Sequence, residues 1–564
     1  RCNRIKLVLN RRWMTAWRLL KSVQLKEFSK RAFRFLYSLN NSSEEIAYSE
    51  WRKKWVELDE NERQKIKDYV DSLTCRPSFT LLLDANDHTQ DALFKTVKSV
   101  LAQLYPHWFL WIINVDSHDA NLERKIDELQ DVRIKLSNSF NSEIGDWVIE
   151  LTSGIELTEI ALFYNVLSIV NNPSAELLYG DHDHIDPLGE FCDPYMKPDW
   201  NPDLFAAMNY FGPLIVFKKE LWQEYWYGRS DLYGFLLEVT ENASSDQIFH
   251  ISDVLASVPV GDDGKHLEPS CRRVSQPLPE PAPLVSILIP TRDNGGLLEK
   301  CLESLFDVTS YPNLEVVLVD HETSETKALK VIKEFEKKEN FRTINFSGSF
   351  NFAAMMNLAG NAAAGEVLVL LNNDVEIIDS EWLSELVSQV SRPEVGVVGA
   401  LLLFGDGTIQ HAGVHPGLGG LMGHGHKHLP GDDPGYFNRL KAVHGVAAVT
   451  GACLAVGKST WVELNGMDED LAVAYNDIDF CLKTRKRGLR VIFTPFSRLL
   501  HHESVSRGLD EPPEKNERLQ SEINTMEKKW GDFLNVDPAY SPNLSSDNFG
   551  FRLAETNKME RFLP

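Results

Sequence analysis

Residues 366–374 have the sequence Glu-Val-Leu-Val-Leu-Leu-Asn-Asn-Asp, and this stretch decides the fold class of the chain. Its run of valine and leucine is typical of a strand that is buried in a parallel sheet, and the run ends at Asn373 and Asp374. Ligands of open α/β sheets bind at the carboxyl ends of the strands. A hard cation that also contacts phosphates is held there by one or two carboxylates. The stretch therefore predicts an α/β fold in which Asp374 binds a divalent cation.

A second acidic string, Asn-Asp-Ile-Asp at 476–479, opens a helical segment that ends near Gly488. Acidic side chains are favoured at the positive end of a helix. We expect Asp477 to face the same sheet edge and to accept a proton from an attacking hydroxyl group. The pair His501 and His502 follows another strand-like run at 491–495. Taken singly, each string is typical of turns or helix caps, but their order along the chain favours a single site.

From residue 285 to about residue 544, the sequence resembles an inverting family 2 glycosyltransferase of the GT-A fold, a Rossmann-like nucleotide-diphospho-sugar transferase fold. The resemblance is to the rhamnosyltransferase-like subgroup of bacterial O-antigen and surface-polysaccharide synthesis. The motifs that carry it lie at 286–293, 311–315, 350–352 with Asn357, 371–376, 410–413, 449–453, 476–482 and 501–508. Such a long ordered set is specific for the family, but it does not specify the sugar.

The resemblance implies a role for individual residues. Asp477 is the expected general base, and Asp374 with His501 is the expected ligand pair for Mg²⁺ or Mn²⁺, with His502 as the alternative to His501. The expected donor-binding residues are Pro290, Thr291, Asp293, Asp320, Asn351, Asn357, Asn373 and Arg507. The expected acceptor-side residues are His444, Thr450, Gly451 and Asn476. The family's earlier metal-motif acids are asparagines here, so one carboxylate carries most of the coordination.

The implied partners are a UDP- or dTDP-sugar donor and a saccharide acceptor, which we expect to be lipid-linked. Two alternatives share the α/β scaffold. A nucleotidyltransferase would show a glycine-rich phosphate loop with Arg or Lys after the first strand, and the segment at 290–296 offers only a faint version. A non-catalytic saccharide-binding scaffold fits the first half of the chain better than the second.

The chain also repeats itself at an offset of 206 residues. Tyr105-Pro106 matches Tyr311-Pro312, Asp87 matches Asp293, and Asn114 falls where Asp320 falls. We therefore expect two tandem GT-A domains. The expected organisation is a basic helical arm and connector at 1–76, a degenerate, non-catalytic GT-A domain at 77–267, a proline-rich linker at 268–283, a catalytic GT-A domain at 284–545 and a tail at 546–564.

The first copy lacks the residues that carry chemistry in the second. The segment at 151–155 has no carboxylate where the metal acid is expected, and the segment at 254–258 has no histidine. Leu232 and Gly234 take the acid positions of the base motif. The string Asp-His-Asp-His at 181–184 suggests a metal site, but adjacent residues alternate sides of a strand, so we favour a structural turn. The histidine- and glycine-rich segment at 413–431 is predicted to be mobile and to cover the acceptor side.

Composition restricts the class of partner and the compartment. The net charge of −24 argues against nucleic-acid binding, and seven scattered cysteines indicate a reducing compartment. No stretch approaches the ~18 apolar residues of a spanning helix. Residues 1–34 carry eleven basic side chains and one acid in an amphipathic pattern, which suits either an anionic membrane surface or the acidic body of the protein. We expect a cytoplasmic protein at the inner face of the membrane, and the opening Arg1 in place of Met indicates a piece of a longer chain.

Overall fold

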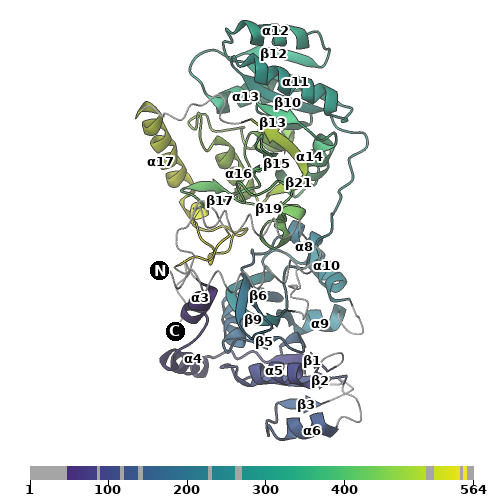
Figure 1. The fold of residues 1–564 in the computed structure, drawn as a ribbon, viewed down its shortest axis with the longest axis vertical. Coiled ribbons are helices and arrows are strands. Elements are labelled where there is room, and N and C mark those ends of the chain that lie inside the picture. The colour runs from purple at the N-terminus through teal and green to yellow at the C-terminus, as the bar shows by residue number, and fades with distance from the viewer. Residues whose placement is uncertain are drawn as a thin grey trace.

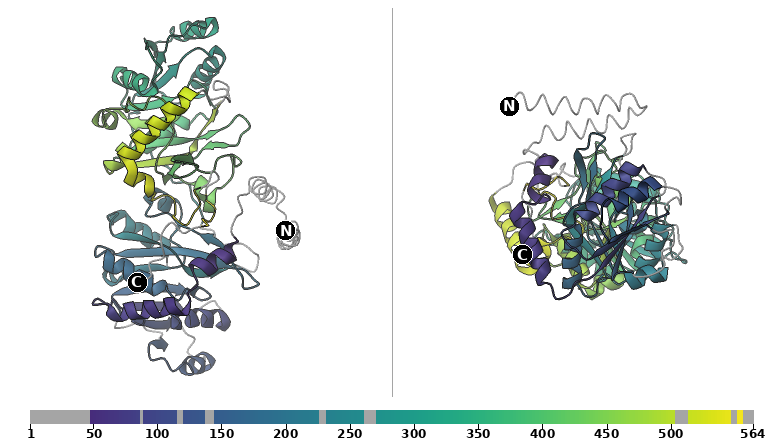
Figure 2. Two further views of the ribbon diagram at one scale, coloured as in Figure 1. Left: turned by 90° about the vertical axis from the view of Figure 1, so that its left-hand side faces the viewer. Right: turned by 90° about the horizontal axis from the view of Figure 1, so that it is seen from below.

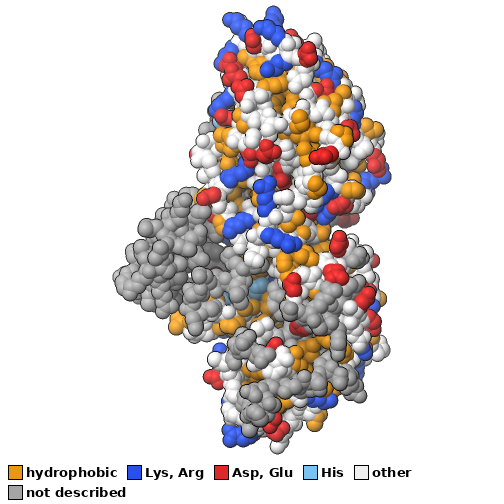
Figure 3. Space-filling view, turned by 90° about the vertical axis from the view of Figure 1, so that its right-hand side faces the viewer, with side chains coloured by type: hydrophobic (Ala, Val, Ile, Leu, Met, Phe, Trp, Pro, Cys, Tyr) orange, Lys and Arg blue, Asp and Glu red, His pale blue; other side chains and the backbone are white. Residues whose placement is uncertain are grey.

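The structure is a computed structural model that describes residues 47–85, 89–114, 120–136, 144–225, 231–260, 270–502, 513–546 and 551–555. Two α/β halves are stacked along the longest axis, the amino-terminal half below the carboxyl-terminal half (Figure 1). Within the described ranges, every helix is too short or too polar to cross a bilayer. On the face in Figure 3, acidic and basic side chains of the described residues are interspersed.

The amino-terminal half is built on a nine-stranded sheet with the order β3-β2-β1-β4-β8-β6-β9-β5, and β7 pairs with β6. Its strands are β1 (Phe79–Asp84), β2 (Trp108–Ile113), β3 (Ile134–Leu136), β4 (Trp147–Thr152), β5 (Glu156–Leu157), β6 (Leu177–Ile185), β7 (Phe191–Tyr195), β8 (Ile215–Lys218) and β9 (Ile248–Pro259). Its helices are α3 (Tyr48–Trp55), α4 (Glu60–Ser72), α5 (Gln90–Leu101), α6 (Ala120–Asp127), α7 (Ala161–Asn171), α8 (Pro202–Ala207), α9 (Lys219–Tyr225) and α10 (Leu232–Asn242).

The carboxyl-terminal half has a ten-stranded sheet with the order β12-β11-β10-β13-β20-β15-β21-β14, and β16 and β19 are attached to it. Its strands are β10 (Val285–Thr291), β11 (Leu314–Asp320), β12 (Phe341–Asn345), β13 (Val367–Leu371), β14 (Val375–Ile377), β15 (Val395–Leu403), β16 (Ile409–His411), β19 (His444–Gly445), β20 (Cys453–Gly457) and β21 (Arg490–His501). Strands β17 (Val414–Pro416) and β18 (Met422–His424) form a separate hairpin.

The helices of the carboxyl-terminal half surround this sheet (Figure 1). They are α11 (Gly295–Val308), α12 (Thr326–Phe335), α13 (Phe352–Ala362), α14 (Trp382–Val390), a 3₁₀-helix (Tyr436–Lys441), α15 (Lys458–Glu463), α16 (Asn476–Lys486) and α17 (Pro513–Asn535). As predicted, a fully buried strand, β13, leads directly into Asp374, and Asp477 lies in the first turn of α16.

The two sheets have the same strand order, element for element, which confirms the tandem α/β fold. The 206-residue offset has a physical basis at the start of each sheet. The hydroxyl of Tyr105 donates to the carbonyl of Pro77 at 2.7 Å, and the hydroxyl of Tyr311 donates to the carbonyl of Pro283 at the same distance. In each copy, a buried tyrosine thus fixes the residue that precedes the first strand.

The ladders also align the two halves residue by residue at the edge where a site is expected. Glu156 of β5 pairs with Ser257 of β9, and Glu376 of β14 pairs with Leu500 of β21. When Glu156 is matched with Glu376 and Ser257 with Leu500, Gly154 falls at the position of Asp374, and Val258 falls at the position of His501.

The halves are joined by polar contacts between α8 and the second sheet. Asp203 lies between two arginines of the second half: its carboxylate oxygens are 2.6 Å from Arg392 and 2.8 Å from Arg490. The amide of Asn201 forms two hydrogen bonds, each 3.0 Å long, with the backbone of Gly445 in β19. Because Asp203 is buried, these contacts are shielded from solvent and favour a fixed relation between the halves.

The carboxyl-terminal helix α17 lies along the second half (Figure 2). It is held there by Asp479 of α16, whose carboxylate accepts a hydrogen bond from Trp530 at 2.7 Å and lies 2.6 Å from Lys529. After α17, the chain runs back to the first half, where Asn543 donates to the carbonyl of Ser252 at 2.7 Å. The segment after α17 consists of turns, in which the N–H of Tyr540 donates to the carbonyl of Asp537 at 3.1 Å and the N–H of Leu544 donates to the carbonyl of Ser541 at 3.0 Å.

One prediction about local structure is wrong. The string at 181–184 forms part of strand β6 rather than a turn, because its charged side chains find partners from distant segments: Asp183 bonds Arg52 of α3 at 2.9 Å, and Asp181 bonds His250 of β9 at 2.8 Å. The segment at 413–431 contains the β17–β18 hairpin, in which His415 is buried and lies 2.8 Å from Asp537, and its mobility over the acceptor side stays a prediction. Residues 1–34 lie outside the described residues.

Candidate active site

The loop that follows β13 is fixed to two neighbouring strands. The side-chain amide of Asn373 donates to the hydroxyl of Thr291 at the end of β10, at 2.9 Å. The backbone amide of Asn372 donates to the carbonyl of Ala452, just before β20, at 3.0 Å. These contacts hold Asp374 at the carboxyl edge of the parallel strands, where the sequence predicted it.

Asp374 and His501 face each other across this edge. Oδ1 of Asp374 lies 3.0 Å from Nε2 of His501, and both side chains are almost fully buried. The other imidazole nitrogen, Nδ1, lies 2.6 Å from Oε1 of Gln410, which can only accept. Nδ1 therefore carries the proton, and Nε2 presents a lone pair, toward which the Asn372 amide also points at 3.4 Å.

Two electron-rich atoms thus face each other, and Oδ1 of Asp374 has no hydrogen-bond donor among the described residues. A carboxylate oxygen and an imidazole nitrogen suit a divalent cation. No group of three or more His, Cys, Asp or Glu side chains suited to a metal occurs in the described ranges, so other ligands would have to come from substrate or water.

His502 points to a different partner. Its Nε2 lies 2.8 Å from the carboxylate of Glu376, which also lies 2.6 Å from Lys300. The structure therefore brings His501, and not His502, to Asp374.

Asp477, in the first turn of α16, faces the turn that leads into β20. Its Oδ2 accepts the backbone N–H of Gly451 at 2.7 Å, and its Oδ1 accepts the N–H of Ile478 at 2.8 Å. Burial raises the pKa of Asp477, and the backbone amides only partly offset this. Gly451 is next to Ala452, whose carbonyl accepts the N–H of Asn372, so two consecutive residues link Asp477 to the loop of Asp374. A carboxylate with a raised pKa is suited to accept a proton.

The predicted donor-binding residues divide into two groups. Thr291 is buried at the end of β10, Pro290 precedes it, and Asp320 ends the adjacent strand β11, so these three lie at the expected edge. Asp293 accepts the backbone N–H groups of Ser324 at 2.7 Å and Glu325 at 2.8 Å, which lower its pKa. Asp293 thus fixes the segment after β11.

The side chains of Asn351 and Asn357 form hydrogen bonds with the protein backbone and do not point into an open site. Asn351 donates to the carbonyl of Glu469 at 2.8 Å, and the Asn357 amide bonds both the N–H and the carbonyl of Met467. The two amides therefore position the segment that precedes the helix of Asp477, and their contact with a nucleotide stays a prediction. Arg507 lies outside the described residues.

The acceptor-side residues are only partly brought together. Thr450 and Gly451 adjoin Asp477, and Asn476 is buried, with its amide donating to the carbonyl of Leu471 at 3.1 Å. His444 is elsewhere: it is buried against Phe493, with ring centroids 5.3 Å apart. On β15, the partners of Phe493 and Leu500 are four residues apart, which corresponds to about 13 Å along the strand. His444 is set apart from the end of β21 because β19 pairs with the early part of that strand, and its place at the acceptor wall stays a prediction.

The sequence did not single out three buried residues near this edge. Gln410 orients His501, although it lay in a motif of the family resemblance. His411 lies 2.9 Å from His424 of the hairpin, between Nδ1 atoms, and burial lowers the pKa of His424 to about 4. His321 follows Asp320, and its Nε2 contacts the carbonyl of Gly348 at 2.8 Å. The available signal was position: Gln410 and His411 lie within the motif at 410–413, and His321 directly follows Asp320.

Comparison with known proteins identifies a family domain in the second half of the chain. Residues 286–425 match the family model described as Glycosyl transferase family 2. The second half of the chain carries a family 2 glycosyltransferase domain. The matched range includes Thr291, Asp320 and Asp374, whereas Asp477 and His501 follow it.

Relatives match over both halves. The chain is 34% identical over 546 residues to "Uncharacterized protein y4gI" of Sinorhizobium fredii, covering 87% of this chain and 60% of that protein. It is 31% identical over 529 residues to "O-antigen biosynthesis protein RfbC" of Myxococcus xanthus, covering 84% and 41%. A stretch of 251 residues, 40% of this chain, is 24% identical to 78% of "N-acetylglucosaminyl-diphospho-decaprenol L-rhamnosyltransferase" of Mycobacterium tuberculosis. The chain thus spans 60% and 41% of its two longer relatives.

Proposed function

We propose that the chain transfers a sugar from a nucleoside-diphosphate sugar to a saccharide acceptor, with inversion at the anomeric carbon. The observation that carries the proposal is the facing pair of Asp374 and His501, with the proton-accepting Asp477 held on an adjoining turn. The family 2 domain that contains Asp374 supports this reaction class.

In the proposed mechanism, each side chain has a separate task. Asp477 takes the proton from the acceptor hydroxyl as that oxygen attacks the anomeric carbon, on the face opposite the leaving nucleoside diphosphate. Asp374 and His501 would hold Mg²⁺ or Mn²⁺, which when bound neutralises negative charge on the diphosphate. Gln410 keeps the proton of His501 on Nδ1, so that Nε2 remains free to act as a ligand.

We further propose that the first half has no catalytic site. Gly154 and Val258 replace the carboxylate and the imidazole. Helix α10 begins at Leu232, and helix α16 begins at Asn476. When these two helix starts are matched, Tyr233, rather than the expected Leu232, takes the position of Asp477. Tyr233 donates to the carbonyl of Phe205 at 2.6 Å, so it contributes to packing.

The nature of the donor and acceptor is inferred from the relatives. The names of two relatives refer to O-antigen biosynthesis and to rhamnosyl transfer onto a diphospho-decaprenol acceptor. We therefore propose a UDP- or dTDP-sugar donor, a lipid-linked saccharide acceptor, and action at the cytoplasmic face of the membrane.

A transfer assay tests the proposal. The full chain is incubated with UDP- and dTDP-sugars, Mn²⁺ or Mg²⁺ and lipid-linked saccharides, and released nucleoside diphosphate is measured. NMR of the product then gives the anomeric configuration, which should be inverted relative to the donor. Asp477→Asn should lower the rate on the order of 10²-fold or more and leave donor binding intact. A product with retained configuration would overturn the mechanism.

A further inference from the structure

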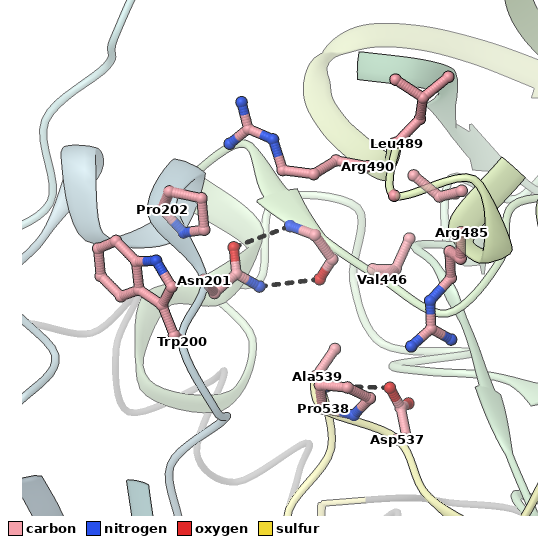
Figure 4. Close-up of a pocket in the computed structure, with 13 residues that line it drawn as sticks. Trp200, Asn201, Pro202, Val446, Arg485, Leu489, Arg490, Asp537, Pro538 and Ala539 are labelled. Atoms are coloured by element: carbon pink, nitrogen blue, oxygen red, sulfur yellow. Dashed lines mark hydrogen bonds between the residues drawn. The ribbon is translucent and has the colours of Figure 1, made fainter. Parts of the chain in front are cut away.

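A cavity of about 200 Å³ lies between the two halves, away from the candidate active site. Three segments line it: Trp200 to Pro202 from the first half, β19 and the start of β21 with the end of α16 from the second, and the segment at 537–539 that follows α17. Figure 4 shows Trp200 on one wall and Arg485 on the opposite wall. On β15, the partners of Arg490 and Leu500 are eight residues apart, so about 26 Å separates the cavity from the edge of Asp374.

Most polar groups of the lining already have partners. The Asn201 amide bonds Gly445, and Arg490 bonds Asp203 and Glu394. The two oxygens of Asp537 accept the N–H of Ala539 at 2.9 Å and face Nδ1 of His415 at 2.8 Å. These groups therefore shape the wall but have little capacity left for a charged ligand.

Arg485 is the exception. In the part of the chain that the structure describes, its guanidinium has no ion pair, and its buried Nη1 has no hydrogen-bond partner. Its cation–π contact is with the ring of Phe533, whose centroid is 5.8 Å from Cζ. Planar guanidinium groups bind carboxylate and phosphate oxygens well. The cavity thus has one uncompensated positive charge.

The opposite wall suits a sugar ring. The partly exposed indole of Trp200 packs on Phe205 and Phe211, with centroids 5.5 and 5.8 Å apart, which fixes its orientation. A rigid aromatic surface facing a cavity of this size can cover the apolar side of one pyranose. A cation on one wall and an indole on the other favour a monosaccharide unit that carries an anionic group.

We propose that this interdomain cavity is a second saccharide site, which binds one anionic sugar unit through its carboxylate or phosphate on Arg485 and its ring on Trp200. The site is separate from the transfer centre, so binding does not require Asp374 or Asp477. Because both halves line the cavity, an occupant would also contact both and would raise the thermal midpoint by mass action.

Calorimetry of the full chain in EDTA tests the proposal, with glucuronate, glucose 1-phosphate and neutral glucose as probes. Glucuronate and glucose 1-phosphate distinguish carboxylate from phosphate as the preferred anion. One of them should bind once per chain, and glucose should bind on the order of tenfold more weakly or worse. Arg485→Gln should reduce binding of the anionic probe by about tenfold or more. Trp200→Leu should weaken both charged and neutral sugars.

Arg487→Gln is the matched control. Arg487 lies two residues from Arg485, is exposed and pairs with Glu463 at 3.2 Å, so its loss should leave binding unchanged. Far-UV circular dichroism checks that each variant is folded, and Arg485→Lys, which keeps the charge, should recover part of the affinity. The proposal is overturned if no anionic probe binds at millimolar concentration, if glucose binds equally well, or if Arg485→Gln binds like the wild type.

Discussion

Oδ1 of Asp374 lies 3.0 Å from Nε2 of His501, and the proton of that imidazole is held on the far nitrogen by Gln410. In the first half of the chain, the same ladder positions hold Gly154 and Val258. A β-carbon on Gly154 would lie 3.3 Å from Cγ of Pro259, so the space that Asp374 and His501 occupy in the second half is lined there by aliphatic carbon. This contrast underlies the proposal of one catalytic site on two related folds.

Replacement of His501 should weaken nucleotide binding only when metal is present. His501→Ala removes a lone pair that faces Asp374, so the affinity for UDP or dTDP in Mn²⁺ should fall by on the order of tenfold or more. Calorimetry of nucleotide binding measures this affinity. His502→Ala is the control, because that side chain contacts Glu376 instead. Equal losses in the two variants would argue against the assigned ligand.

Activity should fall on the acid side at an unusually high pH. Transfer requires ionised Asp477, and burial raises its pKa, so kcat/KM should drop as pH falls through a value above the ordinary aspartate range of about 4. A pH profile with saturating metal measures this limb. The residual activity of Asp477→Asn should not show this fall of kcat/KM on the acid side of the profile. A limb at or below the ordinary range would show that Asp477 is not the base.

The contact between the halves should depend on Asp203. Asp203→Asn removes the charge that pairs with Arg392 and Arg490, and breaking such a buried arrangement costs about 3 kcal/mol. Scanning calorimetry should then resolve separate transitions for the two halves. Glu394→Gln removes the exposed partner of Arg490 and should change the profile little. An unchanged profile in Asp203→Asn would mean that other contacts hold the halves together.

Much of the fold could be predicted because its signals are local. A buried run predicted β13, a helix start with acids predicted α16, and the proline-rich break and the 206-residue offset predicted two copies. The errors come from contacts between distant segments. The position of His444 could not be predicted because the two-residue strand β19 is defined only by its pairing with β21. The strand at 181–184 was missed because Asp183 is neutralised by Arg52, 131 residues earlier. Asp479, next to the predicted base, holds α17 through Trp530, which no spacing indicates.

Stability should depend on pH through His250. Burial would lower its pKa, but the carboxylates of Asp181 and Asp199 outweigh this and raise it to about 9. Because the folded pKa exceeds the unfolded one, the stabilisation is complete below about pH 6.5 and is lost as pH rises through 9. Near pH 6, His250→Gln should therefore lower the free energy of unfolding by on the order of 3 kcal/mol, and its thermal midpoint should lie furthest below that of the wild type. The two midpoints should converge by pH 9 to 10. A pH-independent difference would rule out this titration.

The central claim is one metal-dependent donor site per two-domain chain. Calorimetric titration of the full chain with UDP and with dTDP, each with and without Mn²⁺, tests it most directly, with Asp374→Asn measured in parallel. We predict that one of the nucleotides binds once per chain, only with Mn²⁺, and that Asp374→Asn abolishes this binding. Two nucleotides bound per chain, or binding that Asp374→Asn leaves intact, would contradict the account.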